Sequence, residues 1–454
     1  MVVFILIRFF FFFFKNFNYL NNYIFLVNIF FFFLMNIFIF FNKNVFYYLI
    51  FMNYMIYIDF NIFNILILFI AVYIGIIIIF ISDNKVKNLK YMNIFILFIL
   101  PILTIFYITT KNYIFFFIIY ECFLIPSIYL VFLVSPNKRS LTAVFYFLIW
   151  TQLGSFFVFI AILYILNKTN SWFFFQIAKF DFSNFNKQLI LFLFFIGFGI
   201  KIPTWPFYYW LTKTHVEAPT FFSIYLSGFL VKIALFGLYK FIFLFNFYNF
   251  MYFYLSILFF SVCDSSIKFF SQVDLKKLVA YSTIQEMNLI CIGLFWGTYK
   301  SFLYTIIFSV IHAFLSTIFF YLIDNIYKRY TTRNIYNITN LFTQYPNISF
   351  ILILSCLNYN GFPFSLKFFS EILILNWLLD INLLVFIFFF LCLNWIGTIS
   401  FTYLWFRTLF GINKSLYNSN NIDILTKEKN IFFINFYFFY IFFFNWGYSL
   451  LGRR

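Results

Sequence analysis

Seven ionisable side chains lie inside long apolar runs of the sequence. They are Glu121, Lys201, Lys232, Glu286, His312, Lys367 and Glu371. A charged side chain at the centre of a lipid bilayer costs about 2.5–3.5 kcal/mol on insertion scales. We therefore expect these residues to face the interior of a helical bundle and to pair with one another, and their mixture of acids and bases points to proton transfer.

A chain of neighbouring acids and bases can relay protons. Burial favours the neutral forms of Glu and Lys, whereas an ion pair favours the charged forms. Separating a Glu–Lys pair therefore changes the proton affinity of both partners, so that a proton is taken up on one side and released to the other. The alternative is one ion pair, Glu121–Lys201, that only sets packing. Such pairs stabilise weakly, and one pair does not account for seven residues.

The depth of these residues within their apolar runs predicts partners. Glu121 and Lys201 lie at similar depth and are expected within pairing reach, directly or through one water. Glu286 is expected to pair with Lys232 or His312, or to be held protonated. The alternative is that Glu286 points at a different subunit.

The composition places these residues in a membrane protein. The 454 residues are 65% apolar and 9% charged, whereas a soluble domain is about 45–50% apolar and about 25% charged. A soluble enzyme, a disordered chain and a disulfide scaffold are excluded. The five cysteines form no CxxC pair, and there are two histidines, so we expect no metal or iron–sulfur site in this chain. The 87 Phe residues indicate the codon bias of an organellar genome.

The net charge of +17 does not predict nucleic acid as a partner, because the basic residues are scattered at the ends of apolar runs. If successive helices after Ser82 alternate sides, most Lys and Arg residues of the loops fall on one side of the membrane. Loops on the inner side carry such an excess. We expect this side to be the matrix in an organelle.

Apolar runs long enough to cross about 30 Å of hydrocarbon as helices follow one another along the chain. They predict an all-α integral membrane protein with about 14 transmembrane helices in a single polytopic domain, residues 1–454. We expect N-terminal helices in 1–82, a first five-helix repeat in 91–240, a second in 250–406 and a C-terminal helix in 431–450.

Two of these runs contain prolines that break a helix, Pro203 and Pro363. Each lies in the fourth helix of its five-helix group, and we expect both helices to break inside the membrane and to leave carbonyls that bind water. Five helices begin and end on opposite sides of the membrane, so the second group is inverted relative to the first. This is the plan of transporters whose path lies between discontinuous helices.

The first broken helix carries a motif that resembles a known family. Its sequence KIPTWPFYYWL (201–211), followed by THVEAPT (214–220), is similar to the signature of the antiporter-like subunits of respiratory complex I. The stretches YECFLIP (120–126), SGFLVK (227–232) and DLKKLVAYS (274–282) resemble the same family. The resemblance covers residues 91–406. Glu371 points to the mitochondrial NADH dehydrogenase subunit 4 branch, because the sister subunits carry Lys at that place.

The resemblance implies a proton-translocating membrane-arm subunit of NADH:ubiquinone oxidoreductase in the mitochondrial inner membrane. It implies a proton path that uses the residues Glu121, Lys201, Lys232, His312 and Glu371. NADH, FMN, iron–sulfur clusters and ubiquinone would lie in partner subunits, with no redox site in this chain. The implied partners are other membrane-arm subunits and membrane lipids, so the chain is not expected as a stand-alone monomer.

Two alternatives remain open. An Mrp-type cation/proton antiporter subunit shares the same helices, although the codon bias and Glu371 favour the complex I branch. The other is a structural spacer whose relay has decayed. Glu286 is its one supporting feature, because the family usually has His there, and the departure puts the middle of the relay in doubt.

Overall fold

The computed structural model describes residues 62–81, 99–134, 138–245, 251–296, 299–363, 365, 367–372 and 396–410. All of them belong to one unit of the chain. Every regular element within these ranges is a helix, and two isolated β-bridges join loop residues, which confirms the all-α prediction. The predicted helices before residue 62 and the predicted helix 431–450 lie outside the described residues.

The first half of the described chain contains a series of apolar helices. Their bounds are α3 Ile62–Ile81, a helix at Ile99–Thr109, α5 Tyr113–Cys122, α6 Leu124–Val134, α7 Lys138–Thr169, α8 Phe174–Lys179, α9 Asn184–Lys201, α10 Tyr209–Glu217, α11 Thr220–Tyr225, the π-helix η1 Leu226–Leu230 and α12 Val231–Phe245. The second half contains α13 Met251–Phe269, α14 Leu275–Trp296, α15 Tyr299–Tyr330, α16 Leu341–Gln344, α17 Pro346–Tyr359, a short helix at 367–372 and α20 Ile399–Phe410.

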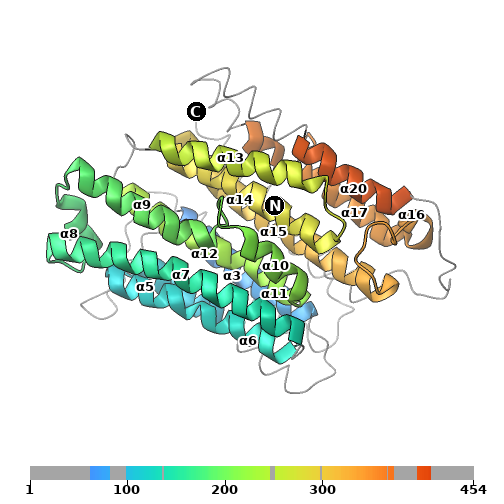
Figure 1. Cartoon of the computed structure of the whole chain (residues 1–454), viewed down its shortest axis with the longest axis horizontal. Coiled ribbons are helices and arrows are strands. Elements are labelled where there is room, and N and C mark those ends of the chain that lie inside the picture. The colour runs from blue at the N-terminus through green and yellow to red at the C-terminus, as the bar shows by residue number, and fades with distance from the viewer. Residues whose placement is uncertain are drawn as a thin grey trace, which may run out of the picture. The chain divides into compact units, whose positions relative to one another are not determined.

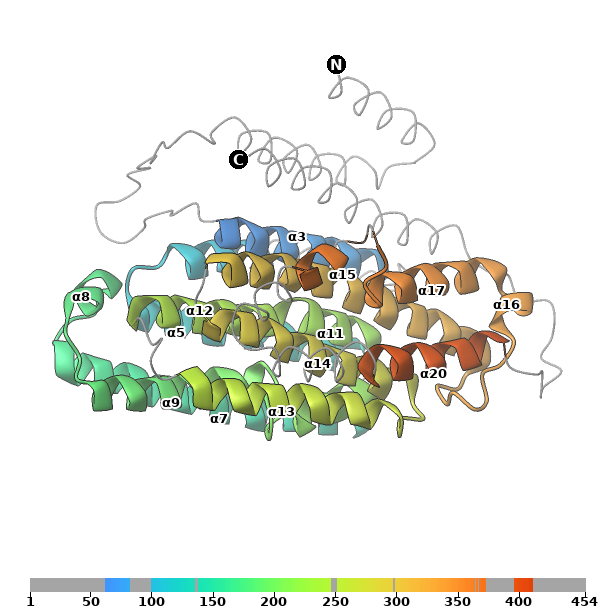
Figure 2. The same ribbon diagram turned by 90° about the horizontal axis from the view of Figure 1, so that it is seen from above.

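Five stretches of described helix are long and apolar enough to cross a membrane. They are Tyr113–Val131, Ser140–Thr169, Thr220–Ile242, Leu275–Phe295 and Tyr304–Tyr330. The apolar window of the last is 100% buried, whereas that of Ser140–Thr169 is 39% buried. Helix α15 is therefore central and α7 presents an apolar face outward. Helices α7, α9, α13, α14 and α15 run side by side (Figures 1 and 2).

Both predicted breaks are present. Helix α9 ends at Lys201 and α10 begins at Tyr209, so the intervening turn contains Pro203. In the second half, α17 ends at Tyr359 and helical structure resumes at 367. A third irregularity was not predicted: the π-helix η1 interrupts the run between α11 and α12. The breaks place charged residues at helix ends, where the regular hydrogen-bonding pattern stops.

Three carbonyls at the first break accept protein donors. The Gly199 carbonyl accepts the backbone N–H of Thr204 at 2.9 Å, and the Ile200 carbonyl accepts the indole N–H of Trp210 at 2.9 Å. The Pro203 carbonyl accepts the side-chain amide of Asn288 at 3.2 Å. Protein donors have taken these positions because buried backbone groups left unpaired are costly.

Candidate functional site

The predicted pair of Glu121 and Lys201 is present. Glu121 lies on α5, and Lys201 is the last residue of α9. The Lys201 Nζ is 3.2 Å from Glu121 Oε1, and the other carboxylate oxygen accepts from Gln152 Nε2 at 3.2 Å. The Lys201 side chain is 9% exposed and that of Glu121 22% exposed. The acid therefore lies nearer to the surface of this chain than its base.

Two further features hold Lys201 in place. Its Nζ lies 3.6 Å from the centre of the Tyr120 ring, within cation–π range. Its position at the C-terminal end of α9 favours a cation, because the helix dipole is negative there. Three features therefore stabilise the charged form of Lys201: the Glu121 carboxylate, the Tyr120 ring and the end of α9.

A second group of ionisable residues forms an unbroken chain of contacts. We call it the central chain, and its members are Lys232, His312, Glu286, Lys367 and Glu371. They come from α12, α15, α14 and the short helix at 367–372. Lys232 is buried, and the exposed fraction of the other four side chains ranges from 2% to 15%.

The first half of the central chain contains two bases in direct contact. Lys232 Nζ lies 2.5 Å from His312 Nδ1 and also donates to the Ser227 carbonyl. This carbonyl is five residues before Lys232, in the π-helix η1, which is why it is available. When Lys232 donates to Nδ1, the remaining imidazole proton is on Nε2. That nitrogen is 3.9 Å from Glu286 Oε2.

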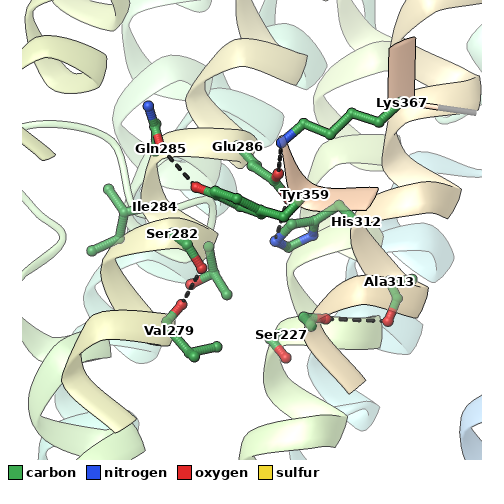
Figure 3. A network of polar contacts seen from close by, with 12 residues as sticks. Ser227, Val279, Ser282, Ile284, Gln285, Glu286, His312, Ala313, Tyr359 and Lys367 are labelled. Atoms are coloured by element: carbon green, nitrogen blue, oxygen red, sulfur yellow. Dashed lines mark hydrogen bonds and ion pairs between the residues drawn. The ribbon is translucent and has the colours of Figure 1, made fainter. Parts of the chain in front are cut away.

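The second half of the central chain places one lysine between two acids, Glu286 and Glu371, and Figure 3 shows its contact with Glu286. Lys367 Nζ is 2.5 Å from Glu286 Oε1 and 4.0 Å from Glu371 Oε1. The ammonium group also lies 3.9 Å from the centre of the Tyr359 ring. Tyr359 donates its hydroxyl to Gln285 Oε1 at 3.0 Å. Glu286 therefore contacts a base through each of its two carboxylate oxygens.

The geometry corrects one predicted pairing. The predicted partners of Glu286 were Lys232 and His312, and His312 is within 3.9 Å. The shortest contact is instead with Lys367, because the helix break after α17 brings the helix at 367–372 against α14. Sequence spacing alone does not reveal how far a broken helix is displaced.

The structure brings the seven predicted residues together as two groups rather than one line. Among the described residues, no ion pair or hydrogen bond joins Lys201 directly to the central chain. The polar contact between the two regions is made by Asn288, on the same helix as Glu286, with the Pro203 carbonyl. Sequence reasoning missed Gln152 and Asn288, although polar amides within apolar runs are themselves a signal.

The motif residues His215 and Glu217 connect the end of α10 to α15 and α7. His215 lies in the last turn of α10, buried and stacked on Phe320. Glu217 accepts the Thr142 hydroxyl at 2.5 Å. The backbone carbonyls at the end of α10 are bound by two basic side chains, since Arg333 donates to Val216 O at 2.7 Å and Lys276 donates to Ala218 O at 2.8 Å.

The described residues contain no group of three or more His, Cys, Asp or Glu side chains that could hold a metal ion. The acids and bases instead contact one another. The neighbours joined by a hydrogen bond, Lys232 with His312 and Lys367 with Glu286, can exchange protons directly, whereas the contacts of 3.9 Å and 4.0 Å must shorten first.

Comparisons with known proteins match this geometry to one group. A family model described as "NADH:quinone oxidoreductase/Mrp antiporter, TM" matches residues 110–397. The chain is 41% identical over 378 residues to NADH-ubiquinone oxidoreductase chain 4 of Paramecium tetraurelia, covering 83% of this chain and 79% of that one. It is 31% identical over 318 residues to the protein of the same name from Dictyostelium discoideum, covering 69% and 58%.

Two solved structures share the fold. A chain of respiratory complex I from Thermus thermophilus with bound NADH aligns with a TM-score of 0.69 at 18% identity, covering 83% of this chain and 78% of that one. A chain of the Mrp complex from Dietzia sp. DQ12-45-1b aligns with a TM-score of 0.70 at 16% identity, covering 79% and 68%.

Proposed function

This chain belongs to the NADH:quinone oxidoreductase/Mrp antiporter family and, within it, to the NADH-ubiquinone oxidoreductase chain 4 group. From that membership we infer that it is a proton-translocating membrane-arm subunit of an NADH:ubiquinone oxidoreductase. The observation that carries the mechanism is the unbroken contact chain from Lys232 to Glu371. The chain works with other membrane-arm subunits in the mitochondrial inner membrane, and its basic loops face the matrix.

We propose that the seven residues Glu121, Lys201, Lys232, Glu286, His312, Lys367 and Glu371 move the protons. In the central chain, the Nε2 proton of His312 passes to Glu286 Oε2 while a proton of Lys232 moves to His312 Nδ1. Lys232 Nζ and His312 Nδ1 are already 2.5 Å apart, whereas His312 Nε2 and Glu286 Oε2 must approach from 3.9 Å before a proton can pass between them. Once Glu286 is neutral, it no longer provides a counterion for Lys367.

Lys367 then turns toward its second acid. Glu371 is 4.0 Å from Lys367 Nζ, so a small side-chain rotation exchanges one carboxylate for the other. When Lys367 returns to Glu286, the ion pair favours the charged Glu286 carboxylate, which releases its proton, and Glu371, now without its cation, takes a proton up. Glu121 and Lys201 form a separate pair at the first broken helix, and Asn288 provides the polar contact between the two regions.

The energy for these moves comes from electron transfer in partner subunits. NADH, FMN, the iron–sulfur clusters and ubiquinone are bound there, and this chain contributes no redox site. Moving one charge against about 100 mV costs about 2.3 kcal/mol, which is within the range of the proton-affinity changes produced by separating a buried ion pair.

We also propose the architecture of about 14 transmembrane helices in one polytopic domain, with two inverted five-helix repeats at 91–240 and 250–406. The positions of the two breaks support it, since each lies in the fourth helix of its group. Residues 1–82 and 431–450 add the N-terminal and C-terminal helices of this plan.

The test is purification of the native chain followed by reconstitution into vesicles. We expect the chain to purify within a large assembly that oxidises NADH with ubiquinone. The pH of the vesicle interior should change as NADH is oxidised. A chain that purifies without NADH oxidation and exchanges protons for a cation gradient would instead support an Mrp-type antiporter subunit, whose fold is similar.

A further inference from the structure

The two Glu–Lys ion pairs occupy matching places in the two proposed repeats. Glu121 is on the second helix of the first repeat and Lys201 adjoins the break in the fourth, 80 positions later in the sequence. Glu286 is on the second helix of the second repeat and Lys367 adjoins the break in the fourth, 81 positions later. The N–O distances are 3.2 Å and 2.5 Å.

A tyrosine ring lies beside the ammonium group of each pair. The Tyr120 ring centre is 3.6 Å from Lys201 Nζ, and the Tyr359 ring centre is 3.9 Å from Lys367 Nζ. Both tyrosines are 2% exposed. An ammonium over the face of an aromatic ring is attracted by the ring quadrupole, most strongly where water is excluded.

The two rings reach their lysines from different positions in the chain. Tyr120 directly precedes Glu121 on α5, whereas Tyr359 is the last residue of α17, before the second break. The same contact is therefore built twice by different routes. The two ring–lysine contacts are therefore not inherited from the duplication of one repeat, and we attribute them to a requirement that the two ion pairs share.

The rings attract the ammonium groups even when the carboxylates are neutral, which the acids themselves cannot do. When a relay acid takes up a proton, its lysine loses the counterion but remains in a medium where an unpaired charge is costly. The ring is a partner whose attraction does not depend on the protonation of the acid. The ring holds the Lys201 ammonium beside Glu121 until that carboxylate is charged again. It keeps the Lys367 ammonium within reach of both Glu286 and Glu371 while the lysine exchanges one acid for the other.

The two tyrosines are anchored differently. The Tyr120 hydroxyl has no hydrogen-bond partner among the described residues, so only its ring face acts on Lys201. The Tyr359 hydroxyl donates to Gln285 Oε1 at 3.0 Å, and Gln285 Nε2 donates to Ser266 Oγ at 3.0 Å. Gly397 approaches Gln285 so closely that a Cβ there would lie 2.3 Å from Nε2, which keeps the amide in place.

We propose that Tyr120 and Tyr359 are matching positioning residues, each of which holds the lysine of one Glu–Lys pair in the proton path while the acid of that pair is neutral. The inference rests on the proposed proton-translocating function and names two residues that the relay itself does not contain. It predicts that the aromatic face, rather than the hydroxyl, is what Lys201 requires.

The test uses the assembled complex in vesicles, with protons pumped per NADH oxidised as the readout. We expect Tyr120→Leu and Tyr359→Leu to lower this ratio by roughly tenfold, the loss of a desolvated cation–π contact. Tyr120→Phe should restore wild-type pumping, and Tyr359→Phe should restore only part because it loses the anchor on Gln285. Tyr225→Leu is the control for loss of a buried, hydrogen-bonded tyrosine: its ring contacts Phe229, its hydroxyl donates to the Phe123 carbonyl at 3.1 Å, and none of the described lysines lies over the ring.

The outcomes separate the two proposals. If the wild-type assembly oxidises NADH without pumping, the proposed function itself fails. If the wild type pumps and both Leu variants behave like Tyr225→Leu, the function stands and the positioning role is wrong. Equal losses in Tyr120→Phe and Tyr120→Leu would also overturn it, because the ring face would then be irrelevant.

Discussion

Lys367 places its ammonium group 2.5 Å from one oxygen of Glu286, while His312 faces the other oxygen at 3.9 Å. Glu286 is therefore the acid through which the two halves of the central chain communicate. Glu286 has a basic partner on each side, and this favours a working relay over a decayed one.

Replacing Glu286 by Gln should remove this link. The amide keeps the size of the side chain but can neither take the His312 proton nor hold Lys367 as a counterion. We expect pumping per NADH to fall by at least about tenfold, since a positioned acid or base contributes about 10²–10⁴-fold to proton transfer. Assembly and NADH oxidation with an artificial acceptor should persist. Wild-type pumping in this variant would mean that the relay bypasses α14.

The Glu121–Lys201 pair can be separated into its packing and relay roles by a double-variant cycle. Glu121→Gln should leave the 9%-exposed Lys201 side chain without its counterion, a loss of up to about 3–5 kcal/mol for a buried pair. Adding Lys201→Met should recover most of that stability, measured as the thermal unfolding midpoint of the assembly. All three variants should pump poorly. Recovery of pumping together with stability would show that the pair serves packing alone.

The turn after α17 controls the position of Glu371. Gly361 has φ +67°, and a Cβ there would lie 2.4 Å from Glu371 Oε2. We expect Gly361→Ala to displace the carboxylate and to add backbone strain of about 1–2 kcal/mol. Gly361→Asn tolerates the backbone conformation better but carries the same Cβ. Reduced pumping in both variants would assign the effect to displacement of Glu371, whereas a normal Asn variant would assign it to strain.

The sequence predicted the elements of this site better than their contacts. Charged residues within apolar runs identify Glu121 and Lys201 as partners, because each must be compensated inside the bundle. The pairing of Glu286 with Lys367 depends on how the chain turns between Tyr359 and the helix at 367–372, which hydropathy does not encode. The π-helix that frees the Ser227 carbonyl is likewise a product of tertiary packing.

Asn288 supplies the last prediction, which concerns the contact between the two groups. Its side-chain amide donates to the Pro203 carbonyl at 3.2 Å and to the Ile284 carbonyl at 2.7 Å, while its Oδ1 is buried with no partner among the described residues. It therefore ties the break beside Lys201 to the helix that carries Glu286. Asn288→Leu has a similar volume but no donor, and leaves the Pro203 carbonyl unsatisfied at a cost of about 1–3 kcal/mol.

We expect Asn288→Leu to lower pumping per NADH several-fold, because the turn that positions Lys201 is no longer held against α14. Asn325 provides the matched control. It is also a buried asparagine, on α15, and its side-chain atoms make no hydrogen bond within the described ranges. Asn325→Leu should therefore leave pumping unchanged and raise the thermal unfolding midpoint, because it removes a buried polar group that has no partner. Equal effects of the two substitutions on pumping would show that the contact with Pro203 does not couple the two groups.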